Sequence, residues 1–195
     1  MNIFRYKFWI GSFALIGLVA CTATFNWREI RSDEQAFTAW FPAKTSKEQK
    51  TITIEGKSRT MVMEAATADK MLFAVGTMNL GQEKDISEKV LKWMKDGVQN
   101  SLKDGKISPE QECFFYLAGE KKQKLNAQGV RLSGFGPDHK YRIYWARWVA
   151  RQDPSGINRI YQLSAIKMFN NEPRASELSQ LTEQYETFFS GFRPY

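Results

Sequence analysis

The stretch KYRIYWARWVAR, residues 140–151, decides the fold, because both of its alternating faces are apolar. Successive side chains of a β-strand point to opposite faces of the sheet. One face carries Tyr141, Ile143, Trp145 and Val149, and the other carries Tyr144, Ala146, Trp148 and Ala150. A strand of this kind must be covered on both faces. We therefore expect it inside a sheet that has other elements packed on each side.

Further β-prone segments surround this strand, and turn residues bound each of them. The sequence QDPSGI, residues 152–157, separates it from NRIYQLSAIKMF and favours a hairpin through its proline and glycine. The other strand candidates are FTAWFP (37–42), KTITIEG (50–56), RTMVMEAAT (59–67), KMLFAVGTMNL (70–80), ECFFYLAGE (112–120) and GVRLSGF (129–135). Short runs at this spacing are typical of an antiparallel sheet.

Two segments have helical periodicity instead. The first starts at Asp85, which with Glu88 forms a potential capping box, and is expected to end near Gly105. Its apolar stripe, which we interpret as a core face, is Ile86, Val90, Met94, Val98 and Leu102. The second runs from Glu177 to Phe189 with Leu178, Leu181, Tyr185 and Phe188 at helical spacing. The order strands, helix, strands, helix predicts an α+β domain with an antiparallel sheet between helical layers.

The N-terminus has the features of an export signal. Arg5 and Lys7 precede an uncharged apolar run, residues 10–20, which is shorter than the ~20 residues that cross a bilayer. The run ends in LVAC, residues 18–21, which resembles the lipobox of bacterial lipoproteins. That resemblance implies that residues 1–20 are a signal peptide and that Cys21 becomes the acylated first residue of the mature chain. An uncleaved, membrane-anchored N-terminus is the alternative.

The expected organisation is a signal peptide (1–20), a lipidated cysteine with a short tether (21–26), and a single domain (27–195). The tether spans less than about 20 Å, so the domain should lie close to the bilayer. Because Thr22 rather than an aspartate follows the cysteine, the resemblance to enterobacterial lipoproteins implies a periplasm-facing protein of the outer membrane.

Charge and cysteine count fit this compartment. The chain carries 28 basic and 21 acidic residues, a net +7, and retains +5 after Arg5 and Lys7 are removed with the signal peptide. In an exported protein such a charge suits an anionic membrane surface rather than nucleic acid. Acylation of Cys21 would leave Cys113 as a lone cysteine, which we interpret as a small buried hydrophobe.

A family resemblance covers most of residues 27–193. A tryptophan leading into FTAWFP, a central helix, the strand YWARWVAR, its partner RIYQLSAI and the terminal FFSGF are similar to bacterial lipoproteins of the PsbP/DcrB-like group. The resemblance implies an α/β/α sandwich around a twisted antiparallel sheet. These motifs specify packing, so no catalytic residue, metal or cofactor comes with them.

The search for catalytic motifs is negative. The sequence has one histidine, His139, and contains no H-E-x-x-H, C-x-x-C, G-x-S-x-G or G-x-x-x-x-G-K motif. His139 lies in GFGPDHKYR, residues 134–142, where it is expected in a solvated turn. We therefore expect a protein that is not an enzyme and has no cofactor.

Two groups of cations are candidate binding residues. Lys121, Lys122 and Lys124 form the run EKKQK, which either is a solvated hairpin tip or faces phospholipid headgroups or an acidic protein. Arg147 and Arg151 lie in line on an apolar strand face, where they either pair with acids across the sheet or end in a cleft.

These observations favour an envelope lipoprotein that acts as a non-catalytic accessory or assembly factor, in contact with the membrane and with an envelope protein. The competing hypothesis is a small-ligand carrier or enzyme with a pocket at the aromatic strand around Trp145, Arg147 and Trp148.

Overall fold

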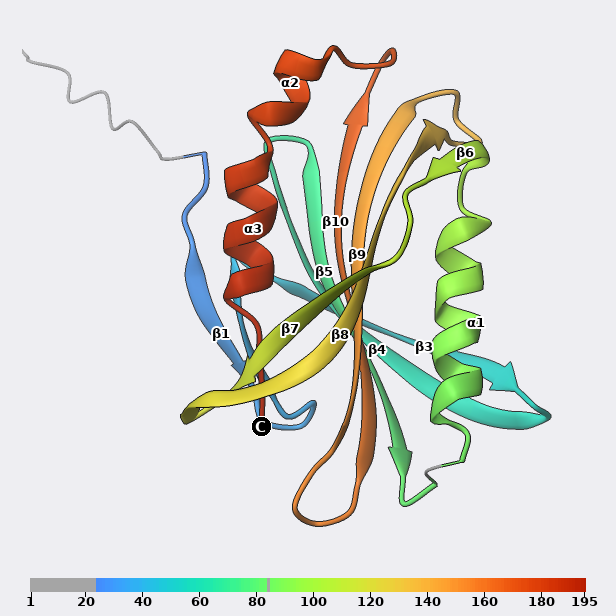
Figure 1. The fold of residues 1–195 in the computed structure, drawn as a ribbon, viewed down its shortest axis with the longest axis vertical. Coiled ribbons are helices and arrows are strands. Elements are labelled where there is room, and N and C mark those ends of the chain that lie inside the picture. Colours follow the sequence, from blue (N-terminus) through green and yellow to red (C-terminus); the bar gives the residue numbers. More distant parts are fainter. Residues whose placement is uncertain (1–23, 84) are drawn as a thin grey trace, which may run out of the picture.

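The computed structural model describes residues 24–83 and 85–195, which are built mainly from antiparallel strands (Figure 1). The larger sheet has eight strands in the order β3-β4-β5-β10-β9-β8-β6, with β7 paired to β8 outside this path. They are β3 (Ser46–Ile54), β4 (Lys57–Ala68), β5 (Met71–Gly81), β6 (Lys103–Ile107), β7 (Gln111–Leu117), β8 (Glu120–Phe135), β9 (Tyr141–Gln152) and β10 (Asn158–Phe169).

A second, three-stranded sheet has the order β1-β2-β11. Its strands are β1 (Arg28–Ser32), β2 (Phe37–Phe41) and β11 (Arg193–Pro194), and the helices are α1 (Ser87–Gln99), α2 (Ala175–Ser179) and α3 (Thr182–Ser190). The predicted strands of the first half are confirmed, but FTAWFP belongs to this small sheet rather than to the meander β3-β4-β5.

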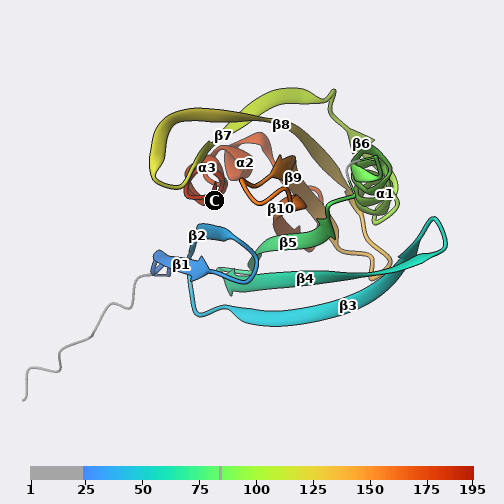
Figure 2. The ribbon, with the colours of Figure 1, turned by 90° about the horizontal axis from the view of Figure 1, so that it is seen from below.

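The predicted α/β/α sandwich is wrong, because the described chain is mostly antiparallel β-sheet and its helices are few. Strands perform much of the covering that helical layers would provide. The β3–β4 hairpin extends past α1, whereas the β7–β8 hairpin extends to the other side of the molecule, over α3 (Figure 2). The small sheet closes the space beneath α3.

The prediction for the central strand is confirmed, because β9 contributes to two separate cores. Tyr141, Ile143, Trp145 and Val149 are buried in the first core, and Ala146 and Trp148 are buried in the second, against which Tyr144 packs. Ala150, at the end of the second face, is exposed. Pairing with β10 on one side and β8 on the other places β9 inside the sheet.

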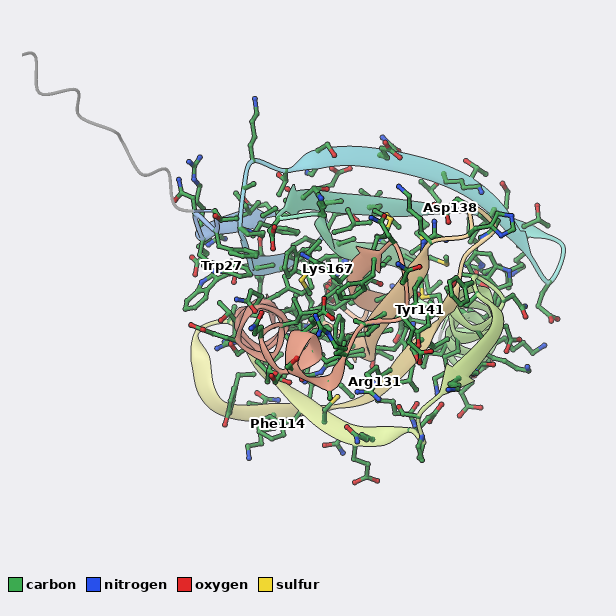
Figure 3. The ribbon with its side chains drawn as sticks, turned by 90° about the horizontal axis from the view of Figure 1, so that it is seen from above. Trp27, Phe114, Arg131, Asp138, Tyr141 and Lys167 are labelled. Carbon is green, nitrogen blue, oxygen red and sulfur yellow. The ribbon has the colours of Figure 1, made fainter. Side chains whose placement is uncertain are left out.

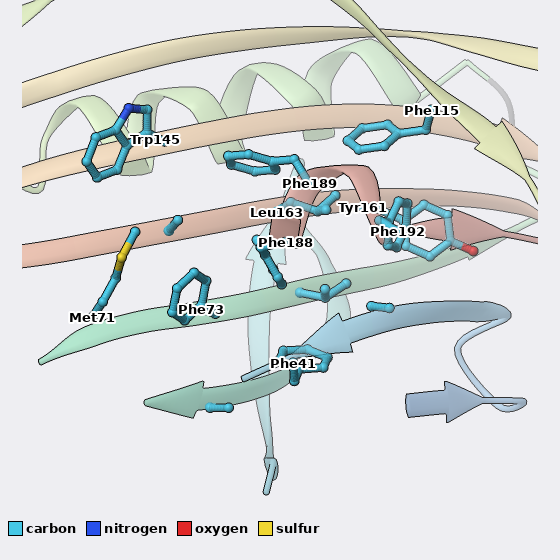
Figure 4. Close-up of a cluster of buried hydrophobic side chains, with 14 of the residues drawn as sticks. Phe41, Met71, Phe73, Phe115, Trp145, Tyr161, Leu163, Phe188, Phe189 and Phe192 are labelled. Carbon is cyan, nitrogen blue, oxygen red and sulfur yellow. The ribbon is translucent and has the colours of Figure 1, made fainter. Parts of the chain in front are cut away.

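The first core lies between the large sheet, the small sheet and α3, and it is rich in phenylalanine (Figure 4). Phe188 of α3 contacts Phe41 and Phe73 at ring-centroid distances of 5.6 and 5.3 Å. Tyr161 of β10 is fully buried, and its hydroxyl donates to the backbone carbonyls of Gln35 and Ala36 at 3.1 and 3.0 Å. These bonds satisfy the one polar group that this ring brings into the core.

The second core forms around α1. Its stripe is confirmed as a core face, since Val90, Met94 and Val98 are buried with Leu102 against the large sheet. The helix ends are wrong, however. The N-cap position is Ile86, which has no side-chain cap, and the helix ends at Gln99 because the chain continues into β6.

The C-terminal helix is interrupted. The sequence predicts one helix over 177–189, whereas the structure has α2 and α3, with Gln180 and Leu181 between them. Leu181 is buried at this break, and Phe188 and Phe189 are buried farther along. The apolar residues that the sequence places on one helix therefore belong to two short helices and the break between them.

The predicted hairpin between β9 and β10 is confirmed. The carboxylate of Asp153 accepts the backbone N–H groups of Ser155 and Ile157 at 2.9 and 3.0 Å, and Gly156 has a φ of 83°. Only glycine adopts this φ without cost. Hydrogen bonds from the Ser155 hydroxyl, the Arg159 guanidinium and these two N–H groups hold the pKa of the Asp153 carboxyl far below its usual range.

Candidate functional site

Phe25, two residues before the predicted domain boundary, already packs against the first core. Phe25 stacks on Trp27 at 6.0 Å, and Trp27 contacts Phe73 edge-on at 5.5 Å. The N–H of Asn26 donates to the carbonyl of Pro42 at 2.8 Å. Cys21 itself lies outside the described residues.

The predicted lysine run begins β8 and follows the turn that joins it to β7. Lys124 lies opposite Tyr116 in the hairpin register, and Asn126 lies opposite Phe114. These residues share the outer face of the hairpin, since Phe115 and Ala127, which alternate with them, are buried in the first core. Lys124 is therefore carried by the paired part of a two-stranded hairpin.

Two aromatic rings, one exposed and one half-buried, accompany Lys124 on this face. Phe114 is 45% exposed and contacts Tyr116 edge-on at 5.3 Å; Figure 3 shows it on the outside of the molecule. The Lys124 ammonium lies 4.1 Å from the centre of the Phe114 ring, and the Arg193 guanidinium lies 5.7 Å from that of Tyr116. We call these four residues, Phe114, Tyr116, Lys124 and Arg193, the aromatic–cation patch.

The sequence analysis missed three members of this patch. The alternation in ECFFYL could have placed Phe114 and Tyr116 on the face opposite Cys113 and Phe115. Arg193 joins the patch only through tertiary structure, because the N–H of Ala118 in the hairpin turn donates to the carbonyl of Pro194 at 2.9 Å. No local pattern predicts that bond.

Arg147 pairs with an acid that comes from a helix rather than from across the sheet. Its guanidinium donates to both carboxylate oxygens of Glu186 on α3, at 2.9 and 3.2 Å, and lies 4.3 Å from the centre of the Phe189 ring. It also lines a cleft of about 370 Å³. Of the two possibilities considered for Arg147, the cleft is realised, whereas the paired acid comes from α3 and not from across the sheet. The ion pair attaches α3 to β9.

Arg151 is placed differently. It lies opposite Arg159 in the β9–β10 register, and within the described structure its Nε has no hydrogen-bond partner. Both arginines line a hollow of about 610 Å³ together with Asp85 and Glu88. Two cations and two carboxylates give this hollow no net charge.

The structure separates the side chains that the ligand-pocket hypothesis combines. Trp145 and Arg147 line the cleft beside α3, where Trp145 stacks on Tyr185 at 4.7 Å. Trp148 points to the opposite face, donates its indole N–H to the Oε1 of Gln162 at 2.9 Å, and lines a different cleft of about 540 Å³ near α1. Lys124 also lies on this opposite face, away from Arg147.

The two candidate reactive side chains are in ordinary environments. His139 is exposed in the turn before β9, with a φ of 58° and its N–H donating to the carbonyl of Gly136 at 3.1 Å. Cys113 is half-buried, and burial raises the pKa of its thiol, although Arg147 nearby opposes the shift. A raised pKa lowers the thiolate fraction at neutral pH.

Within the described ranges, no three or more histidine, cysteine, aspartate or glutamate side chains are grouped so that they could hold a metal ion. In the same ranges, none of the helices has the length and apolar character needed to cross a membrane.

Neither the known family models nor the curated proteins contain a match to this chain. The resemblance to the PsbP/DcrB-like group therefore stays a prediction, and the sandwich that it implied is wrong.

Proposed function

We propose that this chain is a bacterial envelope lipoprotein, anchored through Cys21, whose domain acts by binding rather than by catalysis. The leader with its LVAC motif supports the anchor. On this proposal the protein faces the periplasm, with the outer membrane favoured by Thr22, and acts as an accessory or assembly factor for an envelope protein.

The packing of Phe25 is the observation that carries this proposal. Three residues, 22–24, separate Cys21 from Phe25, the first packed ring of the described residues. At about 3.3–3.6 Å per residue, an acylated Cys21 would hold Phe25 within about 14 Å of the anchor. A domain held so close presents its surface to the membrane and to neighbouring membrane proteins.

The environments of the polar side chains support binding over catalysis. Arg147 is engaged by Glu186 and Phe189 and so serves packing. The Cys113 thiol has a raised pKa, which opposes its use as a nucleophile. His139 lies in an exposed turn.

Replacement of the anchor residue tests the proposal. In a bacterial host grown with labelled palmitate, Cys21→Ser should abolish lipid labelling and leave the unprocessed precursor. Cys113→Ser is the matched control and should be labelled and processed normally. Normal maturation and membrane association of Cys21→Ser would show that the lipoprotein assignment is wrong, and a membrane-bound precursor in the wild type would favour an uncleaved anchor.

A further inference from the structure

One side of the molecule brings together the start of the packed chain, its C-terminal strand and the tip of the β7–β8 hairpin. Figures 1 and 2 both place β1, the C-terminus and this tip on the left. Thr38 of β2 pairs with Arg31 of β1 and with Arg193 of β11. β11 in turn accepts the bond from Ala118 in the hairpin turn. Consecutive backbone bonds therefore fix the tip relative to β1.

The tip has the composition of a surface that binds lipid headgroups. Residues 118–124, AGEKKQK, carry three lysines and one glutamate. Arg193 adds a further positive charge, and its guanidinium donates to the carbonyls of Ser190 and Phe192, which holds it in place. Among the nearby acids, Asp33 pairs with Arg31 at 2.7 Å, and Glu112 lies toward the opposite end of β7 from the tip.

The two rings of the patch, exposed Phe114 and half-buried Tyr116, add an apolar component. The Lys124 ammonium lies over the Phe114 ring, and the Arg193 guanidinium lies over the Tyr116 ring. Aromatic rings next to lysine and arginine are typical of a membrane interface, where the ring enters the headgroup region and the cation contacts phosphate. Phe114 is one of the largest exposed apolar side chains of the described chain.

We propose that the hairpin tip and the aromatic–cation patch dock on the surface of an anionic lipid bilayer. The inference rests on the proposed function. A lipid bilayer is the expected partner because the segment with the proposed anchor joins the domain on this same side. Residues 1–23 contain the leader and Cys21 and join the domain at Thr24, next to β1. An anchor at Cys21 and a docked hairpin thus place the same side against the membrane, and the lysines supply the attraction to anionic lipid.

Hydrogen exchange on the full-length protein tests this docking. The protein is reconstituted into vesicles of phosphatidylcholine alone or with phosphatidylglycerol, and amide exchange is followed by mass spectrometry. Exchange in residues 111–124 should slow several-fold in the anionic vesicles relative to the neutral ones, whereas exchange in α1 should be equal in both. High salt should reduce the difference, because it screens the lysines.

A triple variant, K121E/K122E/K124E, should lose this protection. The matched control K89E/K106E/K140E changes the net charge equally at exposed lysines of α1, β6 and the turn before β9, and should retain it. Equal exchange in both kinds of vesicle, or equal loss in the two triple variants, would overturn the docking surface. Each comparison uses protein attached to the vesicles in the same way, so it tests the docking surface alone. A wrong assignment of the Cys21 anchor would be detected by the palmitate-labelling experiment instead.

Discussion

At the scale of single residues, tertiary position decides what each aromatic ring does. Trp148 is 2% exposed and hydrogen-bonded to Gln162, whereas Phe114 is 45% exposed beside a lysine. Both rings lie in β-prone segments, and alternation along the strand is the only local feature that distinguishes a buried from an exposed position. Burial of Trp148 was predictable because β9 is apolar on both faces. Exposure of Phe114 was not predictable, because it depends on how the β7–β8 hairpin curves over the core.

Trp148→Ala should lower the free energy of unfolding by about 3–5 kcal/mol, the range for truncation of a buried large aromatic, and Trp145→Ala should fall in the same range. Loss of the indole also leaves the Oε1 of Gln162 without the Trp148 N–H donor. Trp93→Ala is the control, since that ring is 39% exposed on α1 and its removal should change stability by less than about 0.5 kcal/mol. Denaturant titrations measure all three. Equal, small effects would mean that β9 is not central to the packing.

At the scale of elements, periodic segments were predictable and their ends were not. The stripe of α1 identified the helix and its buried face, but the expected capping box at Asp85 was wrong, because the helix begins at Ser87 and its N-cap position is Ile86. β11 has two residues and exists only because β2 lies beside it, so no local signal marks it. The small sheet, and with it Arg193, could not be derived from the sequence for that reason.

Gly191, at the end of α3, tests how tightly the small sheet packs on this helix. A Cβ placed there would lie 2.6 Å from Cγ and 2.7 Å from Cβ of Trp40, close to the β2 backbone. Gly191→Ala should therefore destabilise the protein by about 1–3 kcal/mol through overpacking, although its φ of −80° suits any residue. Gly97→Ala in α1 is the matched control, because nothing lies within 4 Å of the added methyl group. It should stabilise by about 0.5–1 kcal/mol. If thermal unfolding shows the same sign for both, the contact with Trp40 is not restrictive.

At the scale of the whole molecule, the sequence indicated a central sheet covered on both faces but not what covers it. The order of the predicted elements suggested helical layers, because the sequence contains two amphipathic helical segments. In the structure, the β3–β4 and β7–β8 hairpins extend to opposite sides of the molecule, so strands supply much of the cover (Figure 2). This arrangement depends on long-range pairing, as in the shared β8 that pairs with β9, β7 and β6. The lysine run could be identified from sequence, but its place beside β11 of the small sheet could not.

If the protein acts through its surface, the lysines of the hairpin should matter more for its function than Cys113 and His139, the candidate reactive side chains. If the domain works by binding, the lipidated double variant C113S/H139A should restore the phenotype of a gene deletion as well as the wild type does. Neither side chain has a partner arrangement that would activate it, and burial raises the pKa of the Cys113 thiol. K121E/K122E/K124E, produced at the same level, should complement poorly, because it replaces attraction to an anionic surface with repulsion. K89E/K106E/K140E controls for the change in net charge and should complement fully. The reverse pattern, with loss of function in the double variant and none in the hairpin variant, would contradict a binding role and would direct attention to chemistry at Cys113 or His139.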